Sequence, residues 1–224
     1  MDLSPLPCPA QPNPYVTTAR RAIYDSPWIR VREDRFRHRQ GAEGRYAVCG
    51  FHRTACGVLA LDEDDRVILV GQWRYPLELY SWEIPEGGGE SSESPFDAVR
   101  RELAEEAGLQ ATLWEPLCFF HPSNSSTEEE SFLFLASGLS PSEGHQPEDD
   151  EELQLHREPF AHCLQRVLAG EITDSLTVMA LLALQARRSG VAAALDPALA
   201  ERFFQRPDQH PSAGRSRWSN LGEP

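Results

Sequence analysis

A helix with clear signals at both ends lies in the middle of the sequence, between Ser94 and Gly108. Ser94 is a good N-cap residue, and Pro95 suits the first helical position because its φ angle is already helical. Gly108 can take the left-handed conformation that ends many helices. These signals predict a helix over residues Pro95–Ala107, and the neighbouring residues indicate what that helix carries.

Three glutamates crowd one face of this predicted helix, at Glu102, Glu105 and Glu106. Carboxylates three or four residues apart repel one another by roughly 0.2–0.5 kcal/mol per pair, so an isolated helix gains nothing from the arrangement. A divalent cation reverses the sign of the interaction, since Mg²⁺ prefers oxygen ligands and keeps waters for contact with phosphate oxygens. A solvated acidic face is the alternative, and it is the usual reason for a run of charges. We favour a metal site.

The residues before the helix can supply the rest of such a site. Glu86–Gly89 reads as a turn in which backbone carbonyls of Glu86 or Gly87 approach a metal closely, because glycine has no Cβ and tolerates positive φ. Glu93 and Arg101 are expected to orient the ligands. Arg101 lies one turn before Glu105 and can neutralise part of the acidic face.

The spacing of these residues resembles a known family. From Gly87 through Glu93 to Arg101–Leu109, the sequence fills every fixed position of the Nudix box, G-x5-E-x7-R-E-U-x-E-E-x-G-U with U aliphatic. The resemblance implies the Nudix fold, an α/β/α sandwich with a mixed sheet, here with a small N-terminal β subdomain. It also implies hydrolysis of a nucleoside diphosphate linked to another group, without a covalent enzyme intermediate.

Residue by residue, the resemblance assigns the metal ligands. Glu102 and Glu106 are the leading ligands, and Glu105 is a third or bridging one. A carbonyl of Glu86 or Gly87 completes the shell. The implied cofactor is Mg²⁺, with Mn²⁺ as the alternative, and its role is to neutralise the diphosphate and activate the attacking water.

Two short strings before the box, Gln72–Pro76 and Ser81–Pro85, resemble those of Nudix enzymes that hydrolyse ADP-ribose and related nucleotide sugars. ADP-ribose, cleaved to AMP and ribose 5-phosphate, is therefore the expected small-molecule substrate. The alternatives are another nucleotide sugar, a dinucleoside polyphosphate, or a non-catalytic ADP-ribose sensor, which the intact glutamates oppose. The residues expected to bind substrate are Arg74, Trp82, Glu83, Pro122 and Ser123.

Each of these assignments has a structural alternative. Arg74 can bind a diphosphate through two N–H groups, but it can also form a surface ion pair. Trp82 can stack on a base or pack in the core. His121, in the loop after the box, is more often a structural histidine than a base.

The general base is expected outside the box, because the box glutamates are committed to metal. In this branch of the family an acidic residue on the loop before the last strand approaches the water when substrate binds, and here Glu148–Glu152 occupies that place. A solvated acidic loop is the alternative. In order of preference the catalytic candidates are Glu151, Glu152 and Asp149, followed by Glu105 and the loop Glu128–Glu130.

Composition limits the kinds of partner that the chain is expected to bind and the compartment in which it is expected. The net charge of −14 argues against broad binding to nucleic acid or to an anionic membrane. All 21 basic residues are arginine, so phosphate groups must be met by guanidinium or by metal. The five cysteines lack CxxC spacing and fit free thiols in a reducing compartment. With no apolar run long enough for a membrane helix and no recognisable secretory signal, the expected location is cytoplasmic.

The chain is expected to contain one main domain with extensions. A strand-rich segment before the box resembles the extension through which ADP-ribose pyrophosphatases dimerise, so a homodimer is expected. The expected divisions are a disordered Pro-rich leader at 1–14, the dimerisation strands at 15–54, the Nudix hydrolase domain at 55–190, and a short helix with a loose tail at 191–224. The strands expected in the main domain are Cys56–Leu61, Arg66–Trp73, Tyr80–Ile84, Leu117–Phe120, Phe132–Ala136 and Leu153–His156, and the expected helices after the box are Pro159–Ala169 and Asp174–Arg188.

Overall fold

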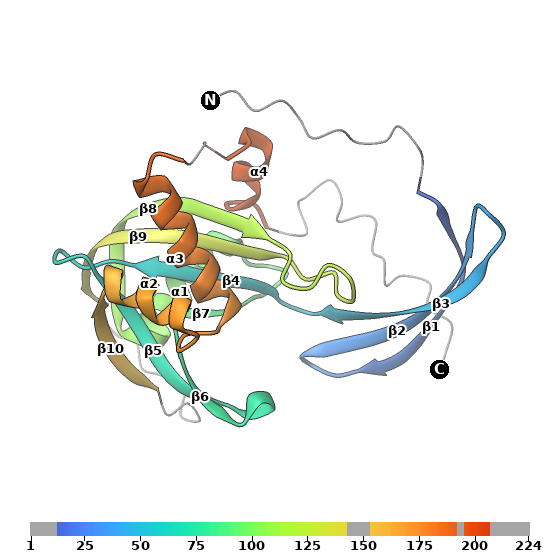
Figure 1. Ribbon diagram of the computed structural model, residues 1–224, viewed down its shortest axis with the longest axis horizontal. Coiled ribbons are helices and arrows are strands. Elements are labelled where there is room, and N and C mark those ends of the chain that lie inside the picture. Colours follow the sequence, from blue (N-terminus) through green and yellow to red (C-terminus); the bar gives the residue numbers. More distant parts are fainter. Residues whose placement is uncertain (1–12, 143–152, 192–194, 207–224) are drawn as a thin grey trace. The chain divides into compact units, whose positions relative to one another are not determined.

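The structure is a computed structural model that describes residues 13–142, 153–191 and 195–206 (Figure 1). The chain forms two compact units. The N-terminal unit comprises residues 13–52 and the loop Ser123–Glu129, and the main unit comprises residues 53–122 with the described residues from Glu130 onward.

The N-terminal unit is an antiparallel sheet of three strands in the order β1-β2-β3. Its strands are β1 (Tyr15–Asp25), β2 (Ile29–His38) and β3 (Glu43–Phe51). The loop Ser123–Glu129 joins this sheet, because the Cys49 N–H donates to the Ser126 carbonyl at 2.9 Å. Glu128 in the same loop lies 3.6 Å from Arg30 and 3.7 Å from Arg32 of β2.

The main unit contains two sheets. The four-stranded sheet has the order β7-β4-β9-β8, and the three-stranded sheet has the order β10-β5-β6. Strands β4 and β9 are parallel and the other pairs are antiparallel, which confirms the expected mixed sheet. The strands are β4 (Thr54–Ala60), β5 (Arg66–Arg74), β6 (Leu79–Glu83), β7 (Glu86–Gly89), β8 (Leu109–Phe120), β9 (Ser131–Pro141) and β10 (Gln154–Pro159), and a 3₁₀ turn, η1 (Tyr75–Leu77), separates β5 from β6.

Three expectations about strands need correction. The strands at Cys56–Leu61 and Arg66–Trp73 exist, and the acidic segment Asp62–Asp65 between them predicts a strand-turn-strand unit. In the structure β4 and β5 pair in different sheets, and the bridge between Leu61 and Val67 is the contact that joins their ends. The expected turn at Glu86–Gly89 is a strand, because its backbone pairs with β4 from Gly57↔Glu86 to Thr54↔Gly89. The strand expected at Leu117–Phe120 is only the end of β8.

The box helix was predicted with the correct bounds. Helix α1 runs over Pro95–Ala107, the Ser94 Oγ accepts a hydrogen bond from the Asp97 N–H at 3.1 Å, and Gly108 ends the helix at φ 63°. After β10 follow α2 (Phe160–Ala169), α3 (Ser175–Arg188) and α4 (Pro197–Arg202). Asp174 caps α3 as expected, since its Oδ2 accepts from the Thr177 N–H at 2.7 Å.

The helices cover opposite faces of the strands, as the α/β/α architecture requires. Val58 and Ala60 of β4 pack in one core cluster with residues of α1. Leu59 and its alternate neighbour Leu61 pack in a second cluster with residues of α2 and α3. Figure 1 shows α3 crossing in front of β4, β8 and β9.

The C-terminal segment is part of the α1 layer. Phe203 is fully buried, with ring centroids 5.0 Å from Phe132 and 5.1 Å from Phe134. Its carbonyl accepts a hydrogen bond at 3.0 Å from the Phe96 N–H in the first turn of α1. The last described residues therefore hold the start of the box helix, whereas residues 207–224 of the expected loose tail, like residues 1–12 of the expected leader, lie outside the described part of the chain.

Within the described ranges no helix is both long enough and apolar enough to span a membrane. The cysteines at 49, 56, 118 and 163 are free thiols. Burial raises the pKa of Cys56 and of Cys163 to about 12, so neither is a reactive thiolate at neutral pH.

Candidate active site

The box helix presents Glu102 and Glu106 to the glycine strand β7. The two residues are one turn apart on α1 and only 8% and 7% exposed. The Glu86 N–H donates to Glu106 Oε2 at 2.8 Å. A Cβ placed on Gly87 would lie 2.2 Å from Glu102 Oε1. The β7 backbone and the two carboxylates are therefore in close contact, because position 87 has no side chain.

Arg101 ties the remaining box residues together. Its Nη1 donates to Glu102 Oε1 at 2.8 Å and to Glu105 Oε2 at 2.7 Å. Its Nη2 donates to Glu93 Oε2 at 3.1 Å and to the Gly88 carbonyl at 3.3 Å. One guanidinium thus offsets the repulsion among three carboxylates, which suits the orienting role expected of Glu93 and Arg101.

The residues fit a hard divalent cation in donor chemistry. Among the described residues no group of three or more His, Cys, Asp or Glu side chains is gathered closely enough to hold a metal ion. Glu102 and Glu105 each accept a hydrogen bond from Arg101. The fit instead rests on the nearly buried carboxylates of Glu102 and Glu106 and on the bare backbone at Gly87. These are the oxygen ligands that Mg²⁺ or Mn²⁺ prefers.

A buried contact between the side chains of Glu86 and Asp174, beside the box, was not predicted from the sequence. The Glu86 carboxyl is buried and shares a side-chain hydrogen bond with Asp174. Burial, together with the negative charges of Asp174 and Glu83, raises the pKa of the Glu86 carboxyl well above its ordinary value. The sequence identified Asp174 only as a helix cap, because nothing local indicates that the start of α3 meets β7.

Arg74 and Glu83, two of the expected substrate residues, form an ion pair with each other. The Arg74 Nε lies 2.9 Å from Glu83 Oε1, and its Nη2 also donates to Glu83 Oε2. Arg74 Nη2 lies 3.4 Å from Glu86 Oε1, which brings this pair to the edge of the box. Arg74 is 36% exposed and Glu83 only 2%. The surface ion pair considered for Arg74 is therefore a half-buried one.

Trp82 is not brought together with this pair. Side chains alternate along a strand, so Trp82 and Glu83 of β6 point to opposite faces of the sheet. Glu83 faces Arg74, whereas Trp82 packs with the α2 and α3 cluster and has its ring 5.6 Å from that of His156. Pro122 belongs to the main unit and Ser123 to the N-terminal unit.

The expected general bases Glu151, Glu152 and Asp149 lie outside the described residues. Of the further candidates, Glu105 is bonded to Arg101, and Glu130 pairs with Arg202 at 2.5 Å. Glu128 lies beside Arg30 and Arg32. His121 lies 4.0 Å from Glu130. The carboxylates at 105, 128 and 130 therefore contact arginines.

Comparison with known proteins agrees with this geometry. The NUDIX domain family matches residues 51–172, more than half of the chain. An ADP-ribose pyrophosphatase from Mycobacterium tuberculosis is 32% identical over 145 residues, which cover 63% of this chain and 69% of the relative. A methanol dehydrogenase activator from Bacillus methanolicus is 35% identical over 135 residues, covering 60% and 73%.

A solved structure described as an ADP compounds hydrolase has the same fold. It superposes with a TM-score of 0.71 at 21% identity, covering 80% of this chain and 98% of the other. The box positions of α1 and β7, the two-layered helix packing and these similarities lead to one assignment. The chain belongs to the Nudix family.

Proposed function

We propose that this chain is a divalent-metal-dependent hydrolase that cleaves ADP-ribose to AMP and ribose 5-phosphate, with Mg²⁺ as its metal. The observation that carries the proposal is the contact of Glu102 and Glu106 with the bare backbone of β7. The similarity to an ADP-ribose pyrophosphatase supports the choice of substrate.

Glu102 and Glu106 would hold the metal, with Glu105 and a carbonyl of Glu86 or Gly87 as further ligands. When bound, a divalent cation supplies neutralisation of the diphosphate oxygens and activation of water. Glu105 can contribute only if it exchanges its bond to Arg101 for one to the metal. Arg101 and Glu93 position the ligands through the hydrogen bonds described above.

Arg74 is proposed to meet the diphosphate or the terminal phosphate. Its hydrogen bonds to Glu83 and Glu86 use Nε and Nη2, which leaves Nη1 for a substrate oxygen. Glu83 fixes the guanidinium, and the absence of lysine from the chain makes arginine the only permanently charged side chain available for this contact.

A substrate panel tests the proposal. The purified chain is assayed with ADP-ribose, other nucleotide sugars and dinucleoside polyphosphates at equal concentration, with Mg²⁺ or Mn²⁺, and the products are separated chromatographically. We expect AMP and ribose 5-phosphate as the fastest-formed pair. Faster cleavage of another compound would reassign the substrate, and tight ADP-ribose binding without turnover would identify a sensor.

Glu106→Gln separates metal chemistry from folding. Glutamine keeps the volume and an oxygen that can accept from the Glu86 N–H, but it removes one charge from the metal site. Turnover should fall by orders of magnitude, whereas the melting temperature should stay or rise because carboxylate repulsion is relieved. Near-normal turnover of both Glu102→Gln and Glu106→Gln at saturating Mg²⁺ would contradict the assigned ligands.

The general base is proposed to be Glu151, with Glu152 and Asp149 as its rivals. Because a positioned base contributes roughly 10²–10⁴-fold, Glu151→Gln should lower kcat within that range and leave substrate binding nearly unchanged. The loss should shrink at higher pH, where hydroxide replaces the base. Losses of less than about tenfold in Gln variants of all three residues would move the base elsewhere.

The N-terminal unit is proposed to form a homodimer. Its three-stranded sheet leaves large apolar side chains exposed, among them Tyr15, Val16, Tyr24, Trp28 and Tyr46. Such side chains are stabilised when a second copy covers them. The proposed cytoplasmic location agrees with the free thiols at the described cysteines.

Two deletions test the dimer by light scattering and by activity. Removing residues 1–50 takes away β1, β2 and nearly all of β3, and it should abolish both the dimer and the activity. Removing residues 1–12 is the matched control, because it keeps two hydrogen bonds at the start of the sheet. The Asn13 Oδ1 accepts from the Tyr15 N–H, and the Pro14 carbonyl accepts from the Arg39 N–H. A fully active monomer from the longer deletion would refute this arrangement.

A further inference from the structure

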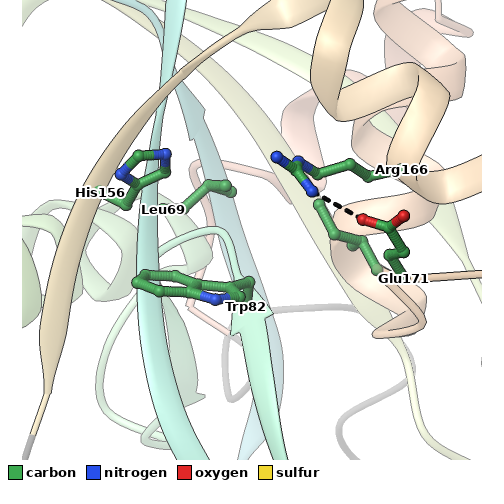
Figure 2. A pocket seen from close by; sticks show the side chains of 6 residues that line it. Leu69, Trp82, His156, Arg166 and Glu171 are labelled. Carbon is green, nitrogen blue, oxygen red and sulfur yellow. Dashed lines mark hydrogen bonds and ion pairs between the residues drawn. The ribbon is translucent and has the colours of Figure 1, made fainter.

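A cavity of about 360 Å³ lies between the three-stranded sheet and α2. It is lined by Leu69 of β5, Trp82 of β6, His156 of β10, Arg166 of α2, and Glu171 and Ile172 of the segment before α3. Figure 2 shows the indole of Trp82 below His156 and Leu69, across the cavity from Arg166 and Glu171.

This cavity is on the opposite face of the sheet from the box residues. In the register of β5 and β6, Gly71 pairs with Trp82 and Val70 with Glu83. Because side chains alternate, Glu83 points toward Arg74 while Trp82 points toward α2. The cavity therefore shares β5 and β6 with the proposed catalytic site but none of the side chains placed there.

Its walls offer a flat apolar surface. Trp82 supplies the indole ring, and Leu69 and Ile172 are each only 2% exposed. The Trp82 ring is held in place by Tyr80 and His156, whose ring centroids each lie 5.6 Å from that of Trp82. A ring wall that is already fixed suits stacking of a planar ligand.

The polar side chains at the cavity are joined by a continuous series of hydrogen bonds. The His156 Nε2 lies 2.8 Å from Glu158 Oε2, and the Arg166 Nε donates to Glu158 Oε1 at 3.3 Å. Arg166 Nη1 then donates to Glu171 Oε2 at 2.6 Å. His162 adds a further contact, with its Nδ1 3.3 Å from Glu158 Oε1.

The charges of these hydrogen-bonded side chains select the kind of ligand. Arg166 lies between Glu158 and Glu171 and donates to both. A phosphate at this position would therefore meet two carboxylates that already share this one arginine. A neutral ring with both N–H donors and acceptors is favoured, because Glu171 can accept and Arg166 and His156 can donate. The volume is at the small end of ligand sites, roughly 300–1,000 Å³, and excludes a dinucleotide-sized compound.

We infer that the cavity formed by Trp82, His156, Arg166 and Glu171 is a second binding site, for an uncharged nucleobase or nucleoside. The ligand ring stacks on Trp82, and its edge meets Glu171 and Arg166. The inference is independent of the proposed reaction, since it uses none of the metal ligands and requires no metal.

The test follows the cavity tryptophan by fluorine NMR. The full chain is labelled with 5-fluorotryptophan, and its five tryptophan signals are assigned with single Trp→Phe variants. Adenosine, inosine, cytidine, uridine and AMP are titrated in the presence of EDTA. We expect at least one nucleoside to shift the Trp82 signal in a saturable way, AMP to act more weakly than adenosine, and the signal of exposed Trp73 to stay unchanged.

A variant at the cavity rim keeps the test independent of folding. Glu171 is 56% exposed, so Glu171→Gln should fold normally, weaken nucleoside binding about tenfold and leave ADP-ribose turnover unchanged. Trp82 packs against the core, and Trp82→Leu is therefore interpreted only if its melting temperature is retained.

Three outcomes would overturn the inference. The first is a Trp82 signal that none of the nucleosides shifts up to their solubility limit. The second is a shift that saturating ADP-ribose or the Glu106→Gln substitution abolishes, because the effect would then originate at the box. The third is equal nucleoside affinity in the original chain and in Glu171→Gln.

Discussion

Gly87 lies directly against the carboxylate of Glu102. A Cβ added at Gly87 would come within 2.2 Å of Glu102 Oε1 and 2.3 Å of its carboxyl carbon. Gly87 is not among the glycines with positive φ in the described residues, so its backbone does not require glycine. Glycine is required at position 87 because the Glu102 side chain occupies the space of a Cβ. The requirement therefore comes from the candidate metal site and not from the conformation of β7.

Gly87→Ala should keep the fold and lose the activity. The new methyl group meets the end of a flexible side chain, so Glu102 can turn aside without a shift of the backbone. We expect a melting temperature close to that of the original chain and a fall in ADP-ribose turnover similar to that of Glu102→Gln. The measurements are thermal unfolding and kcat/KM in Mg²⁺.

Gly88→Ala is the matched control on the same strand. Its Cβ would lie 2.6 Å from Arg53 Cδ, and Arg53 is not among the proposed metal ligands. Turnover in this variant should fall far less than in Gly87→Ala. Equal losses in the two variants would mean that β7 tolerates no side chain, and the specific link between Gly87 and Glu102 would be lost.

Arg74→Ala should destabilise the protein as well as weaken substrate binding. Glu83 is only 2% exposed, and without Arg74 its carboxylate would remain buried without its main partner. Removing one member of a buried pair costs about 3–5 kcal/mol, and partial exposure of Arg74 places the expected loss near the lower end. Urea unfolding measures this loss, and KM for ADP-ribose measures the effect on binding.

The double variant Arg74→Ala with Glu83→Gln separates these two effects. Glutamine removes the buried charge, so a large part of the lost stability should return. Substrate affinity should remain low because the guanidinium is still absent. A return of affinity together with stability would show that Arg74 acts only as a structural partner of Glu83.

Local signals made the box helix predictable. Ser94, Pro95 and Gly108 set its ends through short-range contacts, and the structure has each of them in the expected role. The choice of strand partners depends on distant segments. The sequence around Asp62–Asp65 correctly marks a turn, but only packing decides that β4 joins β9 while β5 joins β10.

Packing between distant segments also limits how much of the candidate site can be predicted from the sequence. Trp82 and Glu83 are both expected to bind substrate because the string Ser81–Pro85 resembles that of ADP-ribose-hydrolysing enzymes, yet the register of β6 separates them onto two faces of a sheet. The closeness of Glu86 to Asp174 arises from the packing of α3 against the strands, and no spacing rule reveals it. The alternation of side chains in Ser81–Glu83 was the one signal that could have distinguished Trp82 from Glu83.

Phe203→Ala should destabilise the main unit by about 3–5 kcal/mol, the usual cost of removing a buried phenylalanine side chain. Phe203 is fully buried among Phe132 and Phe134. Phe204→Ala is the matched control, since Phe204 is 50% exposed and should cost much less. Urea unfolding distinguishes the two variants, and equal losses would contradict the anchoring role of Phe203.

The stabilising effect of Glu158 should depend on pH. Its hydrogen bond with His156, and then those with Arg166, lower the pKa of the Glu158 carboxyl below its ordinary value of 4.5. A carboxylate whose pKa is lower in the folded state stabilises the protein above the unfolded-state pKa, and this contribution is lost as pH falls through the folded-state pKa. The free energy of unfolding of the original chain should therefore exceed that of Glu158→Gln at neutral pH, and the difference should begin to shrink as the pH drops below 4.5. Urea unfolding of both proteins over a pH series measures the difference directly. A difference that stays constant through the acid range would show that Glu158 stabilises the fold by packing rather than by charge.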